Sequence, residues 1–217
     1  ADGQSSQGLF GGLFGKNSEY ADVNVGDTIK FGHYEQDNDI TNGTEPIEWQ
    51  VLGHSGLLLS RYVLDAAKIF PDCIYMSWAQ STVREWLNTD FLETAFTPEE
   101  RARIAVTHVE TPGSAPADDR IFLLSADELT WLVPRPEERI TPAAPHAVRA
   151  SRELRDLTAL LPFYGVRQSC WWWLRNTDPT GHSEPNQMGT VWTDGSICYE
   201  GHYVNYERGI RPALRLI

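Results

Sequence analysis

Hydrophobic and polar residues alternate near the start of the chain, as they do in strands with one buried face. Residues 23–31 show this alternation around a Gly-Asp turn, and residues 47–52 show it after a cluster of turn-forming residues at 37–44. A third apolar run, at 57–60, follows a short His-Ser-Gly turn. Strands joined by turns of this kind predict an antiparallel meander, whose apolar face needs a second layer to cover it.

The second layer is predicted to be helical, because capping residues precede apolar positions spaced three and four apart. Ser81 opens the first such segment, and a second short helix is expected from Phe91. Thr97 is followed by a proline and two acids, which is a strong helix start. Ser125, with Glu128 three residues later, forms a capping box at the start of another helix.

The remaining pattern mixes strands and helices without the regular rhythm of a parallel sheet. Residues 134–145 hold four prolines and predict an extended loop, and 147–161 predict a helix ended by the next proline. Asp194-Gly195 predicts a hairpin turn. The other strands are expected at 104–110, 121–124, 170–174, 190–192, 197–199, 203–206 and 210–216. The fold class is therefore α+β, with an antiparallel sheet and packed helices.

Composition defines the domain limits and excludes several classes of partner. Residues 1–20 are rich in Gly, Ser and Gln and are interpreted as a flexible tether, with a single domain at 21–217. The net charge of −12 argues against nucleic acid. No apolar run of about 18 residues occurs, so we expect no membrane insertion of this chain.

Three cysteines, Cys73, Cys170 and Cys198, are too few for a disulfide-stapled scaffold. Cys170 and Cys198 are the candidate pair, and free buried thiols are an equal alternative. Their spacing does not resemble a zinc site.

The most distinctive stretch is the last quarter of the chain, which opens with three adjacent tryptophans at 171–173. They cannot all face one side of a strand, so at least one should lie in another packing layer or face a ligand. The loops that follow are rich in tyrosine, tryptophan and asparagine, as recognition surfaces are. The candidate ligand-binding residues are Asn176, Asp178, His182, Glu184, Asn186, Trp192, Asp194, Tyr199, His202, Tyr203, Asn205 and Tyr206. Arg175 and Arg211 are expected to anchor carboxylates or backbone carbonyls inside the fold.

Seven short stretches form an ordered set along the chain: residues 26–32, 45–52, 57–60, 83–88, 121–125, 172–175 and 211–214. Taken in this order, they resemble the DUF6273 family of bacterial proteins of unknown function. The C-terminal part is also similar to the C-type-lectin-like fold, with its Trp-rich strand, variable loops and closing Gly-x-Arg strand. This resemblance implies a secreted or cell-envelope protein without an assigned activity.

Calcium is the one cofactor that these residues leave as an alternative to none. Asp37, Asp39 and Thr41 with Glu48 nearly fit a calcium-binding loop, but the glycine falls one place late and strands are expected on both sides. The triplet at 184–186 is only the first half of a calcium-dependent sugar-binding motif. We therefore expect no metal site and no cofactor.

The sequence favours a non-catalytic binding module, secreted or at the bacterial cell surface, for a glycan or protein ligand. One alternative is an oxidative enzyme of the formylglycine-generating type, which would need Cys170 and Cys198. Another is a purely structural envelope domain in which every aromatic residue belongs to the core. No nucleophile elbow, P-loop or dinucleotide-binding motif occurs.

Overall fold

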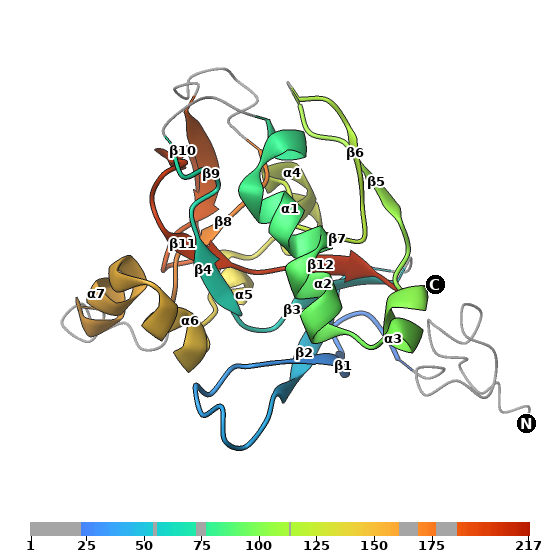
Figure 1. Cartoon of the computed structure of the whole chain (residues 1–217). Helices are drawn as coiled ribbons and strands as arrows, with labels where there is room; N and C mark the ends of the chain where they lie inside the picture. Colours follow the sequence, from blue (N-terminus) through green and yellow to red (C-terminus); the bar gives the residue numbers. More distant parts are fainter. Residues whose placement is uncertain (1–22, 54–55, 73–76, 113, 161–168, 177–185) are drawn as a thin grey trace, which may run out of the picture.

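A computed structural model of the chain describes residues 23–53, 56–72, 77–112, 114–160, 169–176 and 186–217. The tether predicted at 1–20 lies outside these residues. The described part is α+β, as predicted, with two five-stranded sheets side by side and a separate two-stranded ribbon (Figure 1). Strand pairing is antiparallel except between β11 and β8.

The first sheet contains the predicted meander and has the strand order β1-β2-β3-β12-β7. Its strands are β1 (Thr28–Tyr34), β2 (Glu45–Val51), β3 (Leu57–Ser60), β12 (Ala213–Arg215) and β7 (Ile121–Phe122). Alternation along β1 and β2 buries Ile29, Phe31, Ile47 and Trp49. The indole of Trp49 donates to the carbonyl of Phe31 at 2.7 Å, which ties the two strands together inside the core.

The second sheet has the strand order β10-β9-β8-β11-β4, and its strand β10 carries Tyr199, His202 and Tyr203 of the predicted binding residues. Its strands are β10 (Ile197–Tyr203), β9 (Gln187–Val191), β8 (Trp172–Trp173), β11 (Arg208–Ile210) and β4 (Asp65–Ala67). Strands β5 (Thr107–Val109) and β6 (Ala117–Asp119) form the separate ribbon. Trp172 and Trp173 are fully buried, whereas Trp171 is half-buried, so the three adjacent tryptophans do differ in environment.

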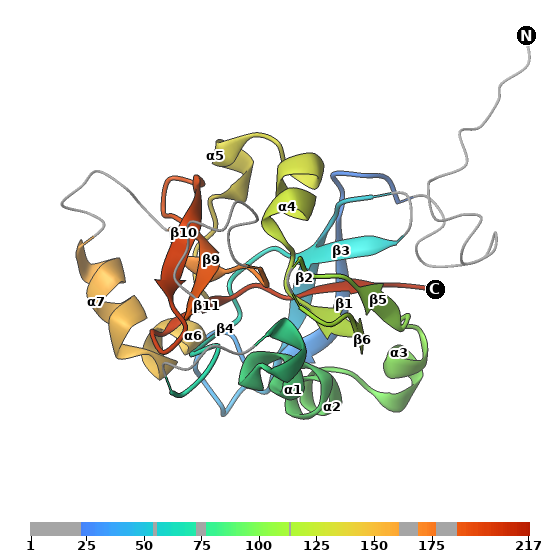
Figure 2. The same cartoon turned by 90° about the horizontal axis from the view of Figure 1, so that it is seen from above.

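Helices lie on both sides of the strands. Figure 2 shows α1 and α2 on one side and α4 and α5 on the other. The helices are α1 (Thr82–Asn88), α2 (Asp90–Ala95), α3 (Pro98–Ala102), α4 (Ala126–Leu132), α5 (Pro136–Arg139), α6 (Pro145–Ala150) and α7 (Arg152–Leu160), with a 3-10 turn at Trp78–Gln80. The predicted caps at Ser81, Thr97 and Ser125 are confirmed, each accepting a backbone N–H three residues later. None of the helices in the described ranges combines the length and apolar character needed to cross a bilayer.

Several predicted elements are wrong in their limits. The helix predicted at 147–161 is two helices, because Ser151 interrupts the first and caps the second through Leu154 N–H at 3.2 Å. The strand predicted at 210–216 is divided between β11 and β12 by Arg211 and Pro212. The strands predicted at 197–199 and 203–206 are one strand, β10, followed by a turn. The predicted loop at 134–145 contains α5.

Candidate aromatic binding site

The β9–β10 hairpin forms where Asp194-Gly195 predicted a turn. The carboxylate of Asp194 accepts the backbone N–H and the hydroxyl of Ser196 at 2.9 and 2.6 Å. The glycine between them has φ of 82°, a conformation that side chains rarely adopt. Further along, β10 shifts its register before His202, next to Gly201 with φ of 79°. This bulge changes the direction in which the last residues of β10 point.

Three aromatic rings pack together at the base of this hairpin. The ring of His202 stacks on Trp171 with centroids 5.4 Å apart and an interplanar angle of 14°. Trp192 meets both rings edge-on, with its centroid 5.1 Å from each. The hydroxyl of Thr190 lies 2.8 Å from Nδ1 of His202 and fixes the orientation of its ring.

Arg208 connects this group to two tyrosines. Its guanidinium carbon lies 4.7 Å from the ring centroid of Trp171 and 5.1 Å from that of Tyr206. Tyr206 in turn packs edge-to-face with Tyr203, with centroids 5.8 Å apart. We call this continuous set the aromatic strip: Trp171, Trp192, His202, Tyr203 and Tyr206, joined through Arg208.

An ion pair with α7 holds Arg208 in place. The guanidinium is buried and pairs with the carboxylate of Glu153, whose other oxygen accepts Glu207 N–H at 3.3 Å. Ser151 donates to the side chain of Glu207 at 2.7 Å, so the start of α7 is attached to β11 at several points. A buried, paired arginine has little conformational freedom, so the rings on it are held in fixed positions.

The strip has an exposed end and a half-buried end. Tyr203 and Tyr206 keep 39% and 40% of their surface exposed, whereas Trp171, Trp192 and His202 are half-buried. Beside the strip, a cavity of about 280 Å³ lies between α7 and the end of β11, with Trp171 and Arg208 in its wall. The strip therefore exposes two tyrosines at one end, while Trp171 and Arg208 line the hollow.

The electrostatics of the strip suit binding better than proton transfer. Burial, with a smaller contribution from the nearby charge of Arg208, lowers the pKa of His202 to about 4. The imidazole is therefore neutral near pH 7 and serves as a packing ring and hydrogen-bond partner.

Four of the predicted ligand-binding residues belong to the strip: Trp192, His202, Tyr203 and Tyr206.

The other described candidates lie outside the strip. Asn176 is buried, and its amide oxygen accepts Ala126 N–H at 2.8 Å, which supports the start of α4. Tyr199 is 42% exposed but lies toward α4, with its hydroxyl 3.4 Å from that of Thr130. Asn186 and Asn205 are half-buried beside the turn after β10, and Asp194 holds the hairpin. Asp178, His182 and Glu184 lie outside the described residues.

Sequence reasoning missed the residues that organise the strip. Trp171 was one of three adjacent tryptophans, and alternation alone could not say which of them would leave the core. Arg208 and Glu153 are separated by 55 positions, so no local pattern links them. The expectation for Arg175 and Arg211 is confirmed. Arg175 binds Glu128 and two backbone carbonyls, and Arg211 donates to the carbonyl of Ser60 at 2.8 Å.

The two described cysteines are free. Cys198 pairs across the sheet with Thr190 of β9, which itself pairs with Trp173 of β8. Strand spacing of about 4.8 Å places Cys198 about 10 Å from β8, beyond the reach of a disulfide to Cys170. Burial raises the pKa of the Cys170 thiol to about 12, which is opposite to the activation that a nucleophile needs.

The acidic residues between β1 and β2 are not arranged as the calcium-binding loop of Asp37, Asp39, Thr41 and Glu48 would require. Oxygens of Glu35, Asp37 and Glu45 lie within 4.8 Å of one another. Glu48, the last ligand of that loop pattern, instead pairs with Arg61 at 2.6 Å. Asp39 accepts the N–H and hydroxyl of Thr41.

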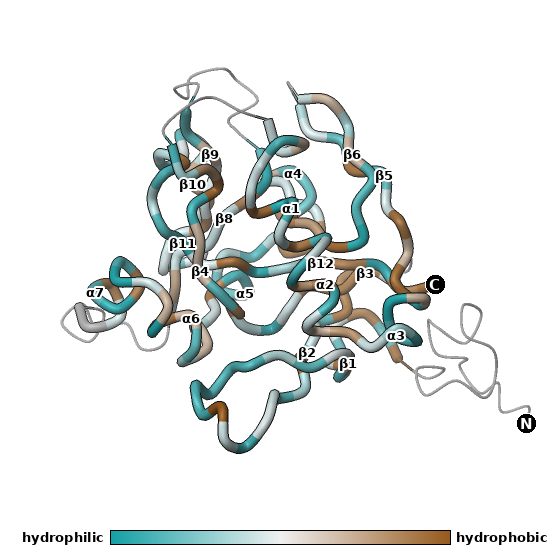
Figure 3. The backbone as a smooth tube through the Cα atoms, viewed as in Figure 1, coloured by the Kyte–Doolittle hydropathy of each residue, from teal (hydrophilic) through white to brown (hydrophobic). Residues whose placement is uncertain are grey.

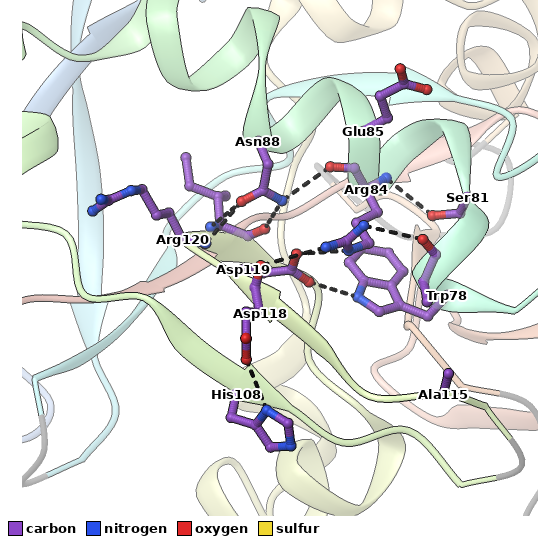
Figure 4. Close-up of polar contacts among 12 residues, drawn as sticks. Trp78, Ser81, Arg84, Glu85, Asn88, His108, Ala115, Asp118, Asp119 and Arg120 are labelled. Atoms are coloured by element: carbon purple, nitrogen blue, oxygen red, sulfur yellow. Dashed lines mark hydrogen bonds and ion pairs between the residues drawn. The ribbon is translucent and has the colours of Figure 1, made fainter.

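A buried polar network lies elsewhere, between α1 and the β5–β6 ribbon (Figure 4). Trp78 and Arg84 both contact the carboxylate of Asp119, and the amide of Asn88 bonds the backbone of Arg120 and Ile121. These contacts link three segments of chain, so the network joins the ribbon to the helices.

Together, these features define an α+β domain that displays an aromatic surface beside a short helix. A family model described as "Domain of unknown function (DUF6273)" matches residues 54–217, and the chain belongs to this family. The matched region begins at residue 54, so two of the stretches that resemble the family, residues 26–32 and 45–52, lie outside it. No curated protein and no solved structure matches the chain significantly.

Proposed function

We propose that this domain is a non-catalytic binding module and that the aromatic strip is its ligand-binding surface. The observation that carries the proposal is the pair of exposed rings, Tyr203 and Tyr206, fixed by a buried Arg208. The proposed ligand is a glycan or another protein, bound outside the cell or at the envelope of a bacterium.

The physical argument rests on preorganisation. Tyrosine offers a large amphipathic surface with only two side-chain torsions, so ordering it on binding costs little entropy. Here Tyr206 is already packed against Arg208, which lowers that cost further. The adjoining cavity and the half-buried Trp192 would add contact area to the tyrosine pair.

A C-type-lectin-like arrangement of the C-terminal part is included in this proposal. The β9–β10 hairpin, the buried Trp172-Trp173 strand and the closing β11 strand support it. The oxidative-enzyme alternative gains no support from Cys170, since the pKa of its thiol is raised by burial. The structural alternative predicts no ligand signal from the wild type or from the variants that lack the tyrosines.

The test is a glycan-array screen, with and without calcium, on three forms of the protein. These are the wild type, the double variant Tyr203→Ala/Tyr206→Ala and the control variant Tyr199→Ala. Tyr199 is on the same strand as Tyr203 and about equally exposed, but its hydroxyl lies beside Thr130 of α4. Circular dichroism verifies that each variant is folded.

We expect a signal that disappears in the double variant and persists in the control. Equal signals in all three forms would place the ligand elsewhere on the domain. No signal from folded wild type would remove the glycan form of the proposal and leave a protein ligand or the structural alternative. Loss of the wild-type signal on chelation would instead indicate a calcium-dependent site.

A further inference from the structure

A second cavity, of about 390 Å³, lies away from the aromatic strip, between the end of β1 and the segment that leads into α6. Its wall is mainly apolar, because prolines and alanines of that segment face Tyr62. The lining residues are Gln36, Asp37, Tyr62, Pro142, Ala143, Ala144 and Pro145. Of these, Asp37 and Pro145 are exposed, so the cavity opens to solvent.

Backbone hydrogen bonds fix the shape of this groove. Val63 N–H donates to the carbonyl of Pro142 at 3.1 Å, and Ala144 N–H donates to the carbonyl of Val63 at 2.8 Å. On the other side, His146 N–H donates to the carbonyl of Gln36 at 3.0 Å. The groove is therefore formed before any ligand arrives.

One end of the groove is strongly acidic. Asp37 lines it, and oxygens of Glu35 and Glu45 lie within 4.8 Å of the Asp37 carboxylate. Backbone N–H groups orient two of these side chains: Gln36 N–H donates to Glu45 at 2.7 Å and Asn38 N–H donates to Glu35 at 2.5 Å. Within the described ranges, none of the three is ion-paired with a basic side chain.

An apolar groove with an acidic end matches a side chain with an apolar stem and a cationic tip. We infer that this groove receives a lysine or arginine side chain of a polypeptide partner. The stem lies along Tyr62 and the prolines, and the charge reaches the carboxylates of Asp37, Glu35 and Glu45. The β1–β2 loop that carries this acidic end is mostly hydrophilic along its length (Figure 3), but Ile40 on it is 86% exposed and offers an apolar contact to the partner.

The test is a nuclear magnetic resonance titration of the ¹⁵N-labelled chain with capped peptides. One peptide carries a single lysine between glycines, one carries arginine, and a third carries acetyl-lysine, which keeps the stem and removes the charge. We expect the first two to shift the backbone amides of Gln36, Tyr62, Ala143 and Ala144, and the acetylated peptide to leave them unchanged.

Two variants and a control separate the groove from the overall negative charge. The triple variant Glu35→Gln/Asp37→Asn/Glu45→Gln removes the charge and keeps one acceptor oxygen on each side chain, although Asp37 loses one of the two oxygens that accept from Asp39 N–H and the Asn42 amide. It should weaken binding by about fivefold for each carboxylate, which is the effect of one charge pair at about 4 Å in water. Ala143→Met fills the groove and should also reduce binding. The control Glu99→Gln/Asp127→Asn/Glu137→Gln removes the same charge from exposed acids elsewhere and should bind as the wild type does.

Equal weakening by the triple variant and the control would overturn the inference, because charge alone would then explain binding. Equal binding of the acetylated peptide would also overturn it. A titration with calcium chloride gives the third outcome: if calcium saturates the same amides and displaces the peptide, the acidic end is a cation site and the inference fails.

Discussion

The carboxylate of Asp119 lies 2.7 Å from Nε of Arg84, and the Asp119 side chain is completely buried. Trp78 donates to its other oxygen at 3.0 Å. Burial nevertheless raises the pKa of Asp119, against the opposing effects of Trp78 and Arg84. The folded protein therefore binds a proton at Asp119 more tightly than the unfolded chain does. The charged form of the carboxylate is stabilised by its contacts with Trp78 and Arg84.

Replacing Arg84 by glutamine should destabilise the protein by about 3 kcal/mol at pH 7, because it leaves a buried charge without its cation. The loss should be smaller at pH 4 than at pH 7, because the pKa of Asp119 is raised by burial and a protonated carboxyl needs no cation. Urea unfolding at the two pH values measures both effects. Arg61→Gln is the control, because Arg61 is exposed in its pair with Glu48 and should cost less than about 1 kcal/mol. A loss in Arg84→Gln that is independent of pH would contradict this account.

His202 should make the protein less stable in mild acid. Its pKa is lowered from 6.5 to about 4 in the folded state, so the unfolded chain binds more protons between these values. The stability contributed by the neutral ring is complete above pH 6.5 and is lost as the pH falls toward 4. Because the ring is only half-buried, we expect the loss to be about 1–2 kcal/mol.

Urea unfolding at pH 7.5 and pH 5 measures this loss, and His202→Gln should reduce it. The imidazole proton signals of the wild type should titrate below pH 5. Titration of His202 near 6.5 in the folded protein would show that the ring is not held in the strip.

The hairpin glycine should tolerate no side chain. A Cβ on Gly195 would lie 1.8 Å from the carbonyl oxygen of Pro136, so Gly195→Ala requires α5 or the hairpin to move. We expect a loss of about 3 kcal/mol or more, measured by thermal unfolding. Gly43→Ala is a matched control, since Gly43 also has positive φ but a Cβ there meets nothing within 4 Å. That control should cost about 1 kcal/mol from backbone strain alone. Equal losses would show that the contact with Pro136 does not matter.

Cys170 should resist alkylation in the folded protein. With a pKa of about 12, its thiolate fraction at pH 8 is about a thousandfold below that of an ordinary thiol. Iodoacetamide labelling of a Cys73→Ser variant, followed by peptide mass spectrometry, should find Cys170 unmodified until urea is added. Rapid modification without urea would reopen the oxidative-enzyme alternative.

Helix starts could be predicted from the sequence, because the residues that form each cap are close together in the chain. Ser81, Thr97 and Ser125 marked helix starts, because a cap and its N–H partner lie within three residues of each other. The split between α6 and α7 was missed, although Ser151 caps locally, because its hydroxyl also contacts Glu207, which lies 56 positions away.

In the candidate site, too, features set by nearby residues could be predicted, whereas features set by contacts between distant residues could not. Tyr203 and Tyr206 could be predicted as surface aromatics, since a strand and its turn must present some side chains outward. Their fixed orientation could not, because it depends on the Arg208–Glu153 pair across the fold. The acidic groove at Asp37 was also hidden, since its apolar wall comes from residues near 142–145.

Strands β11 and β12 are the last to appear along the described chain, yet both are interior strands. β11 lies between β8 and β4, and β12 lies between β3 and β7. During synthesis on the ribosome, the second sheet cannot close until residue 210 has left the exit tunnel, and the first sheet cannot close until residue 215 has done so. Until then the nascent chain carries unpaired strand edges that favour aggregation, so its successful folding depends on how quickly these few residues follow the rest.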